Sequence, residues 1–253
     1  MKIAGQAAVV TGGASGLGEA VAQLLASEGA KVSIFDRNDA LGEAKARQIG
    51  ARFASLDVTD EAAVDAALSA AERHHGAARI LVNCAGIGTP AKVIGKDGKA
   101  QSLADFSKII AVNLTGTFNV LSKFAARIHD APVLGEERGV IINTASVAAY
   151  DGQIGQAAYS ASKGGLVGMT LPLAREFARY GVRVMGIAPG IFLTPLLASL
   201  SQEVQDSLGR QVPFPNRLGQ PQEFALLVQS IIVNPMLNGE VIRLDGAIRM
   251  APK

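Results

Sequence analysis

The chain has few of the residues on which metal, disulfide and nucleic-acid chemistry depend. Its single cysteine, Cys84, excludes an intrachain disulfide framework. The three histidines, His74, His75 and His129, lack the spacing to cysteine that a zinc site needs, so no metal is expected. Lys and Arg number 24 and Asp and Glu 22, with no block of like charge, so neither a nucleic-acid nor a membrane partner is expected.

A long apolar run is also missing. No segment offers the roughly eighteen uninterrupted apolar residues that span a bilayer, and the first residues, MKIAGQAAVVTGG, hold too short an apolar run for a signal peptide. We therefore expect a soluble, cytoplasmic protein. Hydrophobic residues make up 49% of the 253 and charged residues 18%, so residues 1–253 can form one α/β domain with a sizeable core.

Short runs rich in β-branched residues alternate with longer segments rich in Ala and Leu. Several short runs are apolar throughout, which is typical of strands covered on both faces, as in a parallel sheet. The longer segments are long enough for crossover helices. The sequence therefore predicts a Rossmann fold, a doubly wound seven-stranded parallel sheet with about six helices on its two faces. The expected strands are 7–11, 31–36, 51–57, 79–85, 139–146, 182–189 and 240–245.

Three segments depart from this alternation. Residues 94–102 and 129–139 are polar and contain glycine, so we expect both on the surface. Residues 190–221 begin and end with Pro and Gly yet carry several large apolar side chains, which favours a lid over a ligand cleft. A subunit contact is the alternative, since apolar patches often mark interfaces. Those side chains are Phe192, Leu193, Leu196, Leu197, Phe214 and Leu218.

A glycine-rich loop, TGGASGLG, follows the first expected strand and precedes a helical pattern. Its glycines let the backbone turn tightly and approach a pyrophosphate, while the free N–H groups and the dipole of the helix attract the negative charge. The strand before and the helix after are the context that such a loop requires. The loop therefore predicts a dinucleotide site, with Gly12, Ser15, Gly16, Leu17 and Gly18 as cofactor-binding residues.

An acidic residue, Asp36, ends the second expected strand, eighteen residues beyond Gly18. A carboxylate there accepts hydrogen bonds from the adenosine ribose hydroxyls and repels a 2′-phosphate, whereas Arg37 beside it could pair with that phosphate. We give Asp36 more weight, because it occupies the strand end that the geometry assigns to the discriminating residue. The predicted cofactor is therefore NAD rather than NADP.

Two further strand ends belong to the same expected cleft. An aspartate after the third strand can meet the adenine, and small residues after the fourth let the chain pass close to the nicotinamide ribose. The cysteine there has no basic neighbour in sequence, so we expect a small buried side chain rather than a nucleophile. The predicted cofactor contacts are Asp57, Val58, Asn83, Cys84, Ala85 and Gly86.

The stretch YSASK places a phenol, Tyr159, and an amine, Lys163, four residues apart. On a helix these positions share one face, so both groups can reach a common ligand. A free tyrosine, with a pKa of about 10, is a sluggish base at neutral pH. A neighbouring ammonium favours the phenolate and lowers that pKa. The spacing alone is weak evidence, but beside a dinucleotide loop it favours acid/base chemistry.

Six motifs follow one another along the chain: TGGASGLG, NCAG, AVNLTGTF, NTASVA, YSASK and a Pro-Gly pair followed by a threonine. In this order they resemble the classical short-chain dehydrogenase/reductase family over essentially the whole chain. The resemblance implies that Tyr159 is the catalytic acid/base, activated by Lys163, and that Ser146 fixes the substrate oxygen. It also implies that Asn113 anchors a water linking Lys163 to solvent, although a helix kink or cap would explain this asparagine equally well.

Longer phrases, at 138–175, 211–219 and 238–250, resemble one branch of that family, the type II 3-hydroxyacyl-CoA dehydrogenases, also described as 17β-hydroxysteroid or 2-methyl-3-hydroxybutyryl-CoA dehydrogenases. This resemblance implies NAD-dependent interconversion of a short or branched 3-hydroxyacyl-CoA and its 3-oxoacyl-CoA, in fatty-acid or isoleucine breakdown, by a homotetramer. It implies that Gln156 contacts the thioester side of the substrate. The residues implied at the nicotinamide are Tyr159, Lys163, Pro189, Phe192 and Thr194.

Other functions stay open. A 3-oxoacyl-carrier-protein reductase would share the catalytic residues but normally prefers NADPH, against which Asp36 argues. A hydroxysteroid or other secondary alcohol dehydrogenase would share the cofactor and need a different lid. Outside enzymes, the chain could be a structural component of a larger complex, although the intact set of catalytic residues argues against loss of activity.

Overall fold

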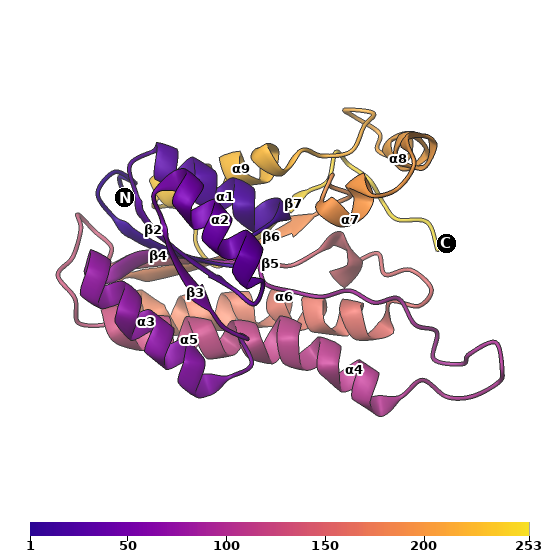
Figure 1. Ribbon diagram of the computed structural model, residues 1–253, viewed down its shortest axis with the longest axis horizontal. Helices are drawn as coiled ribbons and strands as arrows, with labels where there is room; N and C mark the ends of the chain where they lie inside the picture. Colours follow the sequence, from indigo (N-terminus) through magenta and orange to yellow (C-terminus); the bar gives the residue numbers. More distant parts are fainter. Residues whose placement is uncertain (253) are drawn as a thin grey trace.

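The computed structural model describes residues 1–252, apart from the side chain of Leu196. Its centre is a parallel sheet of seven strands in the order β3-β2-β1-β4-β5-β6-β7, with helices packed on both faces (Figure 1). The predicted doubly wound α/β fold is therefore confirmed. The strands are β1 (Ala7–Thr11), β2 (Lys31–Asp36), β3 (Arg52–Ser55), β4 (Ala78–Asn83), β5 (Gly139–Thr144), β6 (Val182–Pro189) and β7 (Val241–Leu244).

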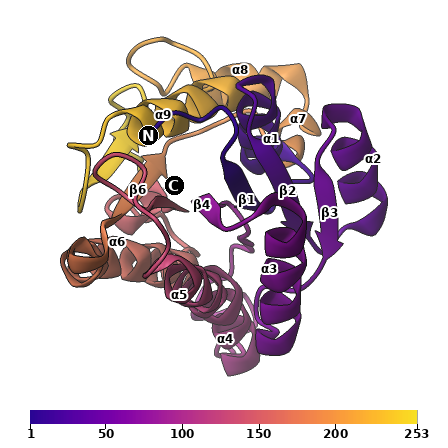
Figure 2. The same cartoon turned by 90° about the vertical axis from the view of Figure 1, so that its left-hand side faces the viewer.

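The helices form two layers, which are also separate in the view turned by 90° (Figure 2). One layer holds α1, α2 and α9, and the other holds α3, α5 and α6, with α4 extending it. The short helices α7 and α8 lie in the segment after β6. The bounds are α1 (Gly16–Ser27), α2 (Asp39–Ile49), α3 (Glu61–His75), α4 (Leu103–Ile110), α5 (Thr117–Ile128), α6 (Ala157–Phe177), α7 (Pro195–Ala198), α8 (Gln202–Gly209) and α9 (Pro221–Val233).

Both faces of each central strand are buried, which explains why these strands are apolar throughout rather than alternating. In β1, Val10 packs with Val21 of α1 and Phe224 of α9 on one face. Its neighbour Val9 points to the other face and packs with Leu121 of α5. The core is thus two layers of side chains separated by the sheet.

The strand order reverses beside β1, because the chain passes from β1 to β2 and β3 on one side and then returns to β4 on the other. Loops that leave β1 and β4 therefore diverge in opposite directions. A crevice forms at the carboxyl ends of the strands at such a reversal. The glycine-rich loop after β1 and the NCAG run after β4 both lie at this edge.

Residues Leu103–Ile128 form one continuous helix of 26 residues, in which a π-helical turn (Ala111–Gly116) joins α4 to α5. By its length, and by a mean hydropathy of 1.2 over an 18-residue stretch, this helix could cross a membrane, although it holds no uninterrupted apolar run of that length. One side of it is core, however, since Val120, Leu121 and Phe124 are buried against the sheet. Its apolar character therefore has a structural explanation within the fold.

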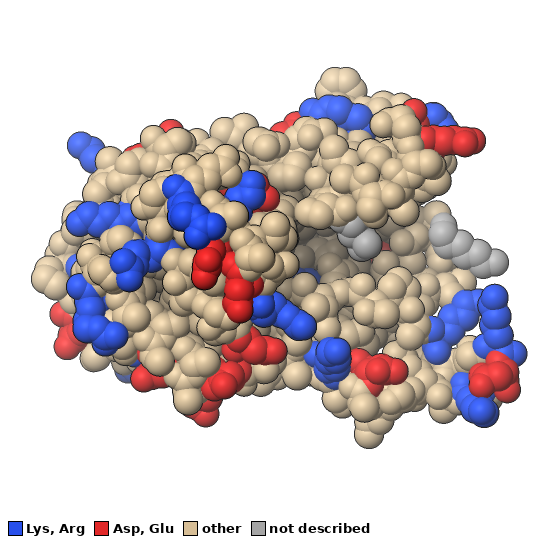
Figure 3. All heavy atoms as spheres, in the orientation of Figure 1, with Lys and Arg blue, Asp and Glu red and all other residues tan. Residues whose placement is uncertain are grey.

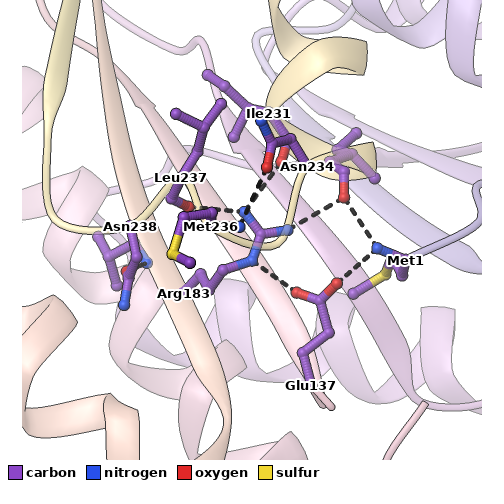
Figure 4. A network of polar contacts seen from close by, with 10 residues as sticks. Met1, Glu137, Arg183, Ile231, Asn234, Met236, Leu237 and Asn238 are labelled. Carbon is purple, nitrogen blue, oxygen red and sulfur yellow. Dashed lines mark hydrogen bonds and ion pairs between the residues drawn. The ribbon is translucent and has the colours of Figure 1, made fainter. Parts of the chain in front are cut away.

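The prediction that residues 129–139 lie on the surface is wrong for two residues, Glu137 and Gly139. Gly139 is buried because it begins β5. Residues 94–102 are mostly exposed, as expected, and so is the tip of the second segment. Glu137, however, is buried, because its carboxylate pairs with the buried guanidinium of Arg183 at 2.7 Å. Figure 4 shows this network, which the amino group of Met1 joins from the opposite side of Glu137. Arg183 also donates to three backbone carbonyls, those of Ile231, Ile232 and Leu237.

Removing one partner of this buried pair is expected to be strongly destabilising. In Arg183→Met the Glu137 carboxylate loses its guanidinium and three carbonyls lose a donor, so the free energy of unfolding should fall by about 3–5 kcal/mol. Urea denaturation at pH 7 measures the change. The matched control is Arg47→Met, because Arg47 pairs with Glu43 on the exposed surface of α2, where ion pairs contribute little. Equal effects of the two substitutions would contradict the assigned role of the network.

Candidate active site

A cavity of about 730 Å³ opens at the carboxyl edge of the sheet, where the surface in Figure 3 is hollowed. On this face of the molecule the positive and negative side chains are interspersed. Eighteen of the residues predicted for the site line the cavity. They are Gly12, Ser15, Gly16, Leu17, Gly18, Asp36, Asp57, Val58, Cys84, Ala85, Gly86, Ser146, Gln156, Tyr159, Lys163, Pro189, Phe192 and Thr194.

At Gly12 and Gly18 the glycine-rich loop is packed too tightly for a side chain. Gly12 has a φ of 65°, and a Cβ there would lie 2.7 Å from the backbone nitrogen of Ala85. A Cβ on Gly18 would collide with the carbonyl oxygen of Gly12. The glycines therefore let the loop after β1, the start of α1 and the run after β4 approach one another at the cavity wall. This cradle at a helix N-terminus fits the pyrophosphate of a dinucleotide.

The Asp36 carboxylate is held against the same loop. One oxygen accepts a hydrogen bond from the backbone nitrogen of Ala14 at 3.1 Å, and the other accepts from the backbone nitrogen of Asn38 at 3.0 Å. Each oxygen keeps a further acceptor position, so ribose hydroxyls can still be bound. Arg37 lines the cavity as well. Asp36 and Arg37, the two residues considered for the choice between NAD and NADP, thus both line the end of the cavity expected to hold the adenosine.

Asp57 and Val58 line the cavity beyond β3. The pKa of Asp57 is lowered chiefly by a hydrogen bond from the backbone N–H of Thr59, with a second bond from its hydroxyl, so the side chain is an anion that only accepts. The carbonyl of Val58 accepts from Asn119 of α5 at 2.8 Å. Both groups are thus held in place by hydrogen bonds at the cavity wall.

Asn83 is not among the residues that line the cavity, so its predicted contact with the cofactor stays a prediction. Asn83 is the last residue of β4, and its amide nitrogen donates to the side-chain oxygen of Asn143, its partner on β5, at 2.9 Å. The amide oxygen accepts from Thr11 of β1 at 3.4 Å. Asn83 therefore joins three adjacent strands within the sheet, and only the residues after it reach the cavity.

Cys84 has the character expected of a structural thiol. Burial raises its pKa to about 11, and the Thr144 hydroxyl lies 3.4 Å from the sulfur. A thiolate is therefore not available at neutral pH. The two residues that follow line the cavity with minimal bulk, and a Cβ on Gly86 would press against Asn113 at 3.2 Å.

Asn113 lies in the π-helical turn and is fully buried outside the cavity wall. Its side-chain oxygen accepts from the backbone nitrogen of Ile87 at 2.8 Å, and its nitrogen donates to the carbonyl of the same residue at 2.9 Å. The nitrogen also lies 3.0 Å from the hydroxyl of Ser162 on α6. The Asn113 side chain therefore links the loop after β4, at Ile87, to α6, at Ser162, the residue before Lys163.

Lys163 is almost completely buried, and its amine donates to the carbonyl oxygen of Thr144 at 2.6 Å. Burial lowers its pKa from the usual 10.5 to about 8. The amine lies 5.7 Å from the centre of the Tyr159 ring, one turn earlier on α6. The helical spacing predicted from YSASK is therefore present, and an ammonium stands beside the phenol inside a poorly solvated pocket.

The pKa of Tyr159 differs from the sequence expectation. Burial raises it above the usual value, and a hydrogen bond from the Ser146 hydroxyl only partly offsets the rise. The rise caused by burial prevails over the expected lowering by the Lys163 ammonium, which donates to the Thr144 carbonyl. Tyr159 is therefore a protonated phenol at neutral pH in this structure, able to give a proton to an oxygen placed between it and Ser146.

The segment 190–221 covers the cavity with its first part only. Phe192 lines the cavity and packs edge-on against Phe224 of α9, with ring centres 6.5 Å apart. Thr194 precedes α7, and its side chain does not cap that helix. Phe214, in contrast, is 82% exposed, and Leu218 is buried away from the cavity, so the later residues are not part of its wall. Leu196 lies outside the described side chains.

Several residues that line the cavity were not identified from the sequence, among them Thr144 and Met250. Thr144 offers its backbone carbonyl to Lys163, and no side-chain pattern reveals such a role. Met250 lies near the end of the chain and reaches the cavity beside residues from α6, which only the folded path of the chain could show. Among the described residues, no cluster of three or more His, Cys, Asp or Glu side chains could hold a metal ion.

Comparison with known proteins agrees with this geometry. Residues 6–205 match the model of the family described as short chain dehydrogenase. The chain is 55% identical to 3-hydroxyacyl-CoA dehydrogenase type-2 of Homo sapiens, covering 99% of this chain and 97% of that protein, and 50% identical to the Drosophila melanogaster protein of the same name, covering 96% and 97%. The crystal structure of 3-hydroxyacyl-CoA dehydrogenase type-2 from Mycobacterium avium superposes with a TM-score of 0.94 at 42% identity, covering 98% of each chain. The chain therefore belongs to the short-chain dehydrogenase family, and it is an oxidoreductase that uses a nicotinamide cofactor.

Proposed function

We propose that the protein interconverts a short or branched 3-hydroxyacyl-CoA and the corresponding 3-oxoacyl-CoA with NAD as its cofactor. The observation that carries the proposal is one cavity that holds the glycine cradle, the Asp36 carboxylate and the hydrogen-bonded pair of Tyr159 and Ser146. The names of the relatives, which are alike over the whole chain, support the acyl-CoA substrate.

The proposed roles follow from the groups at the substrate end. A bound nicotinamide cofactor supplies or takes up the hydride. In the reducing direction Tyr159 gives its phenolic proton to the carbonyl oxygen, which Ser146 steadies with a hydrogen bond. The ammonium of Lys163 stabilises the phenolate that remains. Asn113 holds the run after β4 beside this pair, and we retain for it the role of anchoring a water near Lys163.

The preference for NAD is proposed from the fixed position of Asp36. Its two backbone hydrogen bonds hold the carboxylate beside the glycine-rich loop, where it can accept from two ribose hydroxyls and repel a 2′-phosphate. Arg37 is the competing influence, since it lines the same end of the cavity. We give the Asp36 carboxylate more weight in cofactor selection because two backbone N–H groups orient it. No hydrogen bond orients the Arg37 side chain among the described residues.

The proposed assembly is a cytoplasmic homotetramer that binds neither nucleic acid nor membrane. Exposed apolar side chains on α4, α5 and α6, those of Leu103, Phe118 and Leu171, support association between subunits. The near balance of acidic and basic residues supports the absence of a nucleic-acid partner.

A paired initial-rate assay tests the activity and the cofactor together. Purified protein is supplied with acetoacetyl-CoA and either NADH or NADPH, and the loss of cofactor absorbance is followed. We expect NADH to give the higher kcat/KM, and Asp36→Ser to shift the ratio toward NADPH at least about tenfold, because the repelling charge is removed. Asp97→Ser serves as the control, because Asp97 is an exposed acidic residue in the segment 94–102.

The outcomes separate the alternatives. A strong preference of the unaltered protein for NADPH would overturn the assignment to Asp36 and favour a 3-oxoacyl-carrier-protein reductase. Binding of NADH without turnover of the acyl-CoA would keep the cofactor and direct the search to sterols and other secondary alcohols.

A further inference from the structure

The last residues of the chain cross the substrate end of the cavity. After β7 the chain turns and runs beside residues 150–156, the segment that leads into α6. The backbone nitrogen of Ile154 donates to the carbonyl of Pro252 at 3.0 Å, and the side chain of Gln153 donates to the carbonyl of Ala251 at 2.9 Å. The tail is therefore attached directly to the segment that carries Gln156.

Arg243 of β7 fastens the beginning of this tail. Its guanidinium donates to Asp151 at 2.5 Å, to Asp245 at 2.7 Å and to the carbonyl of Ile248 at 3.0 Å. It also lies over the ring of Tyr150, 5.3 Å from the ring centre. One side chain thus joins β7, the tail and the segment before α6, and its three side-chain partners are acidic or aromatic groups suited to a planar cation.

The turn that starts the tail is held in an unfavourable conformation. Gly246 has a φ of 58° and Ala247 a φ of 69°, and Ala247 is the one residue other than glycine with a positive φ in the described chain. The Asp245 side chain accepts from the backbone nitrogen of Ala247 at 2.9 Å, and its backbone carbonyl accepts from Ile248 at 3.1 Å. Such strain persists only where the surroundings enforce it, and it is typical of functional sites.

The contacts of Arg243 and the turn after β7 together place Met250 at the cavity. Ile248 is buried and anchors the tail, and two residues later Met250 lines the cavity together with Ser146, Gln156 and Tyr159. We propose that Met250 forms the wall that meets the acyl chain of the substrate, and that Arg243 is the positioning residue that sets this wall. The proposal rests on the function proposed above and adds the residue that selects the length of the acyl chain.

The chemistry of methionine favours the acyl chain over the other parts of the substrate. The thioether offers no hydrogen-bond donor and only a weak acceptor, so it does not suit the amides or phosphates of the CoA moiety. It is apolar and flexible, and therefore adapts to a short or branched chain. Because Tyr159 and Ser146 fix the carbonyl oxygen, a wall on the same side of the cavity limits how far the chain can extend.

The test compares two substrates in four variants. Steady-state rates with NADH are measured for 3-oxobutanoyl-CoA and 3-oxodecanoyl-CoA in Met250→Ala, Met250→Phe, Arg243→Gln and the control Met236→Ala, whose side chain is 89% exposed outside the cavity. We expect Met250→Ala to raise the ratio of kcat/KM for the long over the short substrate by about tenfold, and Met250→Phe to lower it. The Kd for NADH should stay the same, and Met236→Ala should leave the ratio unchanged.

Arg243 is tested by coupling to Met250. Arg243→Gln should shift the ratio in the direction of Met250→Ala, and the double variant should shift it no further, because both changes remove the same wall. Arg243→Lys, which keeps the charge but loses the planar fork, should give a partial shift. A ratio within twofold of the unaltered protein in both Met250 variants would overturn this inference alone. Failure of the unaltered protein to reduce either acyl-CoA would overturn the proposed function and the inference with it.

Discussion

Replacing Tyr159 by Phe is expected to lower kcat roughly 100- to 10,000-fold, the range over which a positioned proton donor accelerates a reaction. The substitution removes one hydroxyl oxygen and keeps the ring. That ring packs against the loop after β4, where a Cβ on Gly88 would touch it at 3.4 Å, so the pocket should keep its shape. Binding of NADH, followed by fluorescence titration, should therefore change little.

The pH dependence of the unaltered protein adds a second readout. Burial raises the pKa of Tyr159, so at neutral pH the phenol holds the proton that reduction consumes. The rate of reduction should therefore fall as the pH rises through that pKa, and the rate of alcohol oxidation should change in the opposite sense. Tyr180→Phe is the matched control, because Tyr180 lies in the short 3-10 turn after α6, outside the cavity. Full activity of Tyr159→Phe would remove the tyrosine from the mechanism.

Replacing Lys163 by Met is expected to reduce activity about as severely and to make the protein more stable. At pH 7 the buried ammonium destabilises the fold by on the order of 3 kcal/mol, since burial lowers its pKa from 10.5 to about 8. Methionine removes this penalty but leaves the Thr144 carbonyl without its donor, which costs about 1.5 kcal/mol. The net expectation is a gain of roughly 1–2 kcal/mol in the free energy of unfolding at pH 7.

The gain in stability of Lys163→Met should depend on pH, and this dependence tests whether the buried ammonium is its cause. Between about pH 8 and pH 10.5 the unfolded chain holds a proton that the folded chain has lost, so the unaltered protein gains stability as the pH rises. The advantage of Lys163→Met should therefore shrink by pH 10. Lys96→Met, at an exposed position in the segment 94–102, should show no such dependence of stability on pH in parallel urea denaturation. A loss of stability at pH 7 would mean that the ammonium stabilises the pocket.

The sequence predicted well those features whose local residue pattern agrees with the elements that come before and after it. The glycine-rich loop could be assigned because a strand, tight turns and a helix must follow one another there, and the structure has all three. Tyr159 and Lys163 could be paired because a helical repeat brings positions four apart to one face. The apolar runs marked buried parallel strands for the same reason.

The sequence could not show the surroundings of side chains whose partners come from distant parts of the chain. Asn83 stands at a strand end that borders the cavity, but its partners on β1 and β5 draw its side chain into the sheet. Glu137 lies in a polar segment, yet a guanidinium on β6 makes it core. Burial raises the pKa of Tyr159, and no sequence spacing reveals how deeply the folded chain buries this side chain.

The reversal of strand order beside β1 also governs how the molecule must fold. Each central pairing joins residues far apart in the sequence, for example Asn83 and Asn143 at a separation of 60. Parallel pairings of this kind form slowly, because the entropy of closing the loop is lost before the contacts form. The glycine-rich loop is made early during synthesis, but Lys163 and Thr194, which line the same cavity, emerge much later. A nascent or truncated chain therefore has no complete nucleotide pocket, and cofactor affinity reports that both halves have been joined.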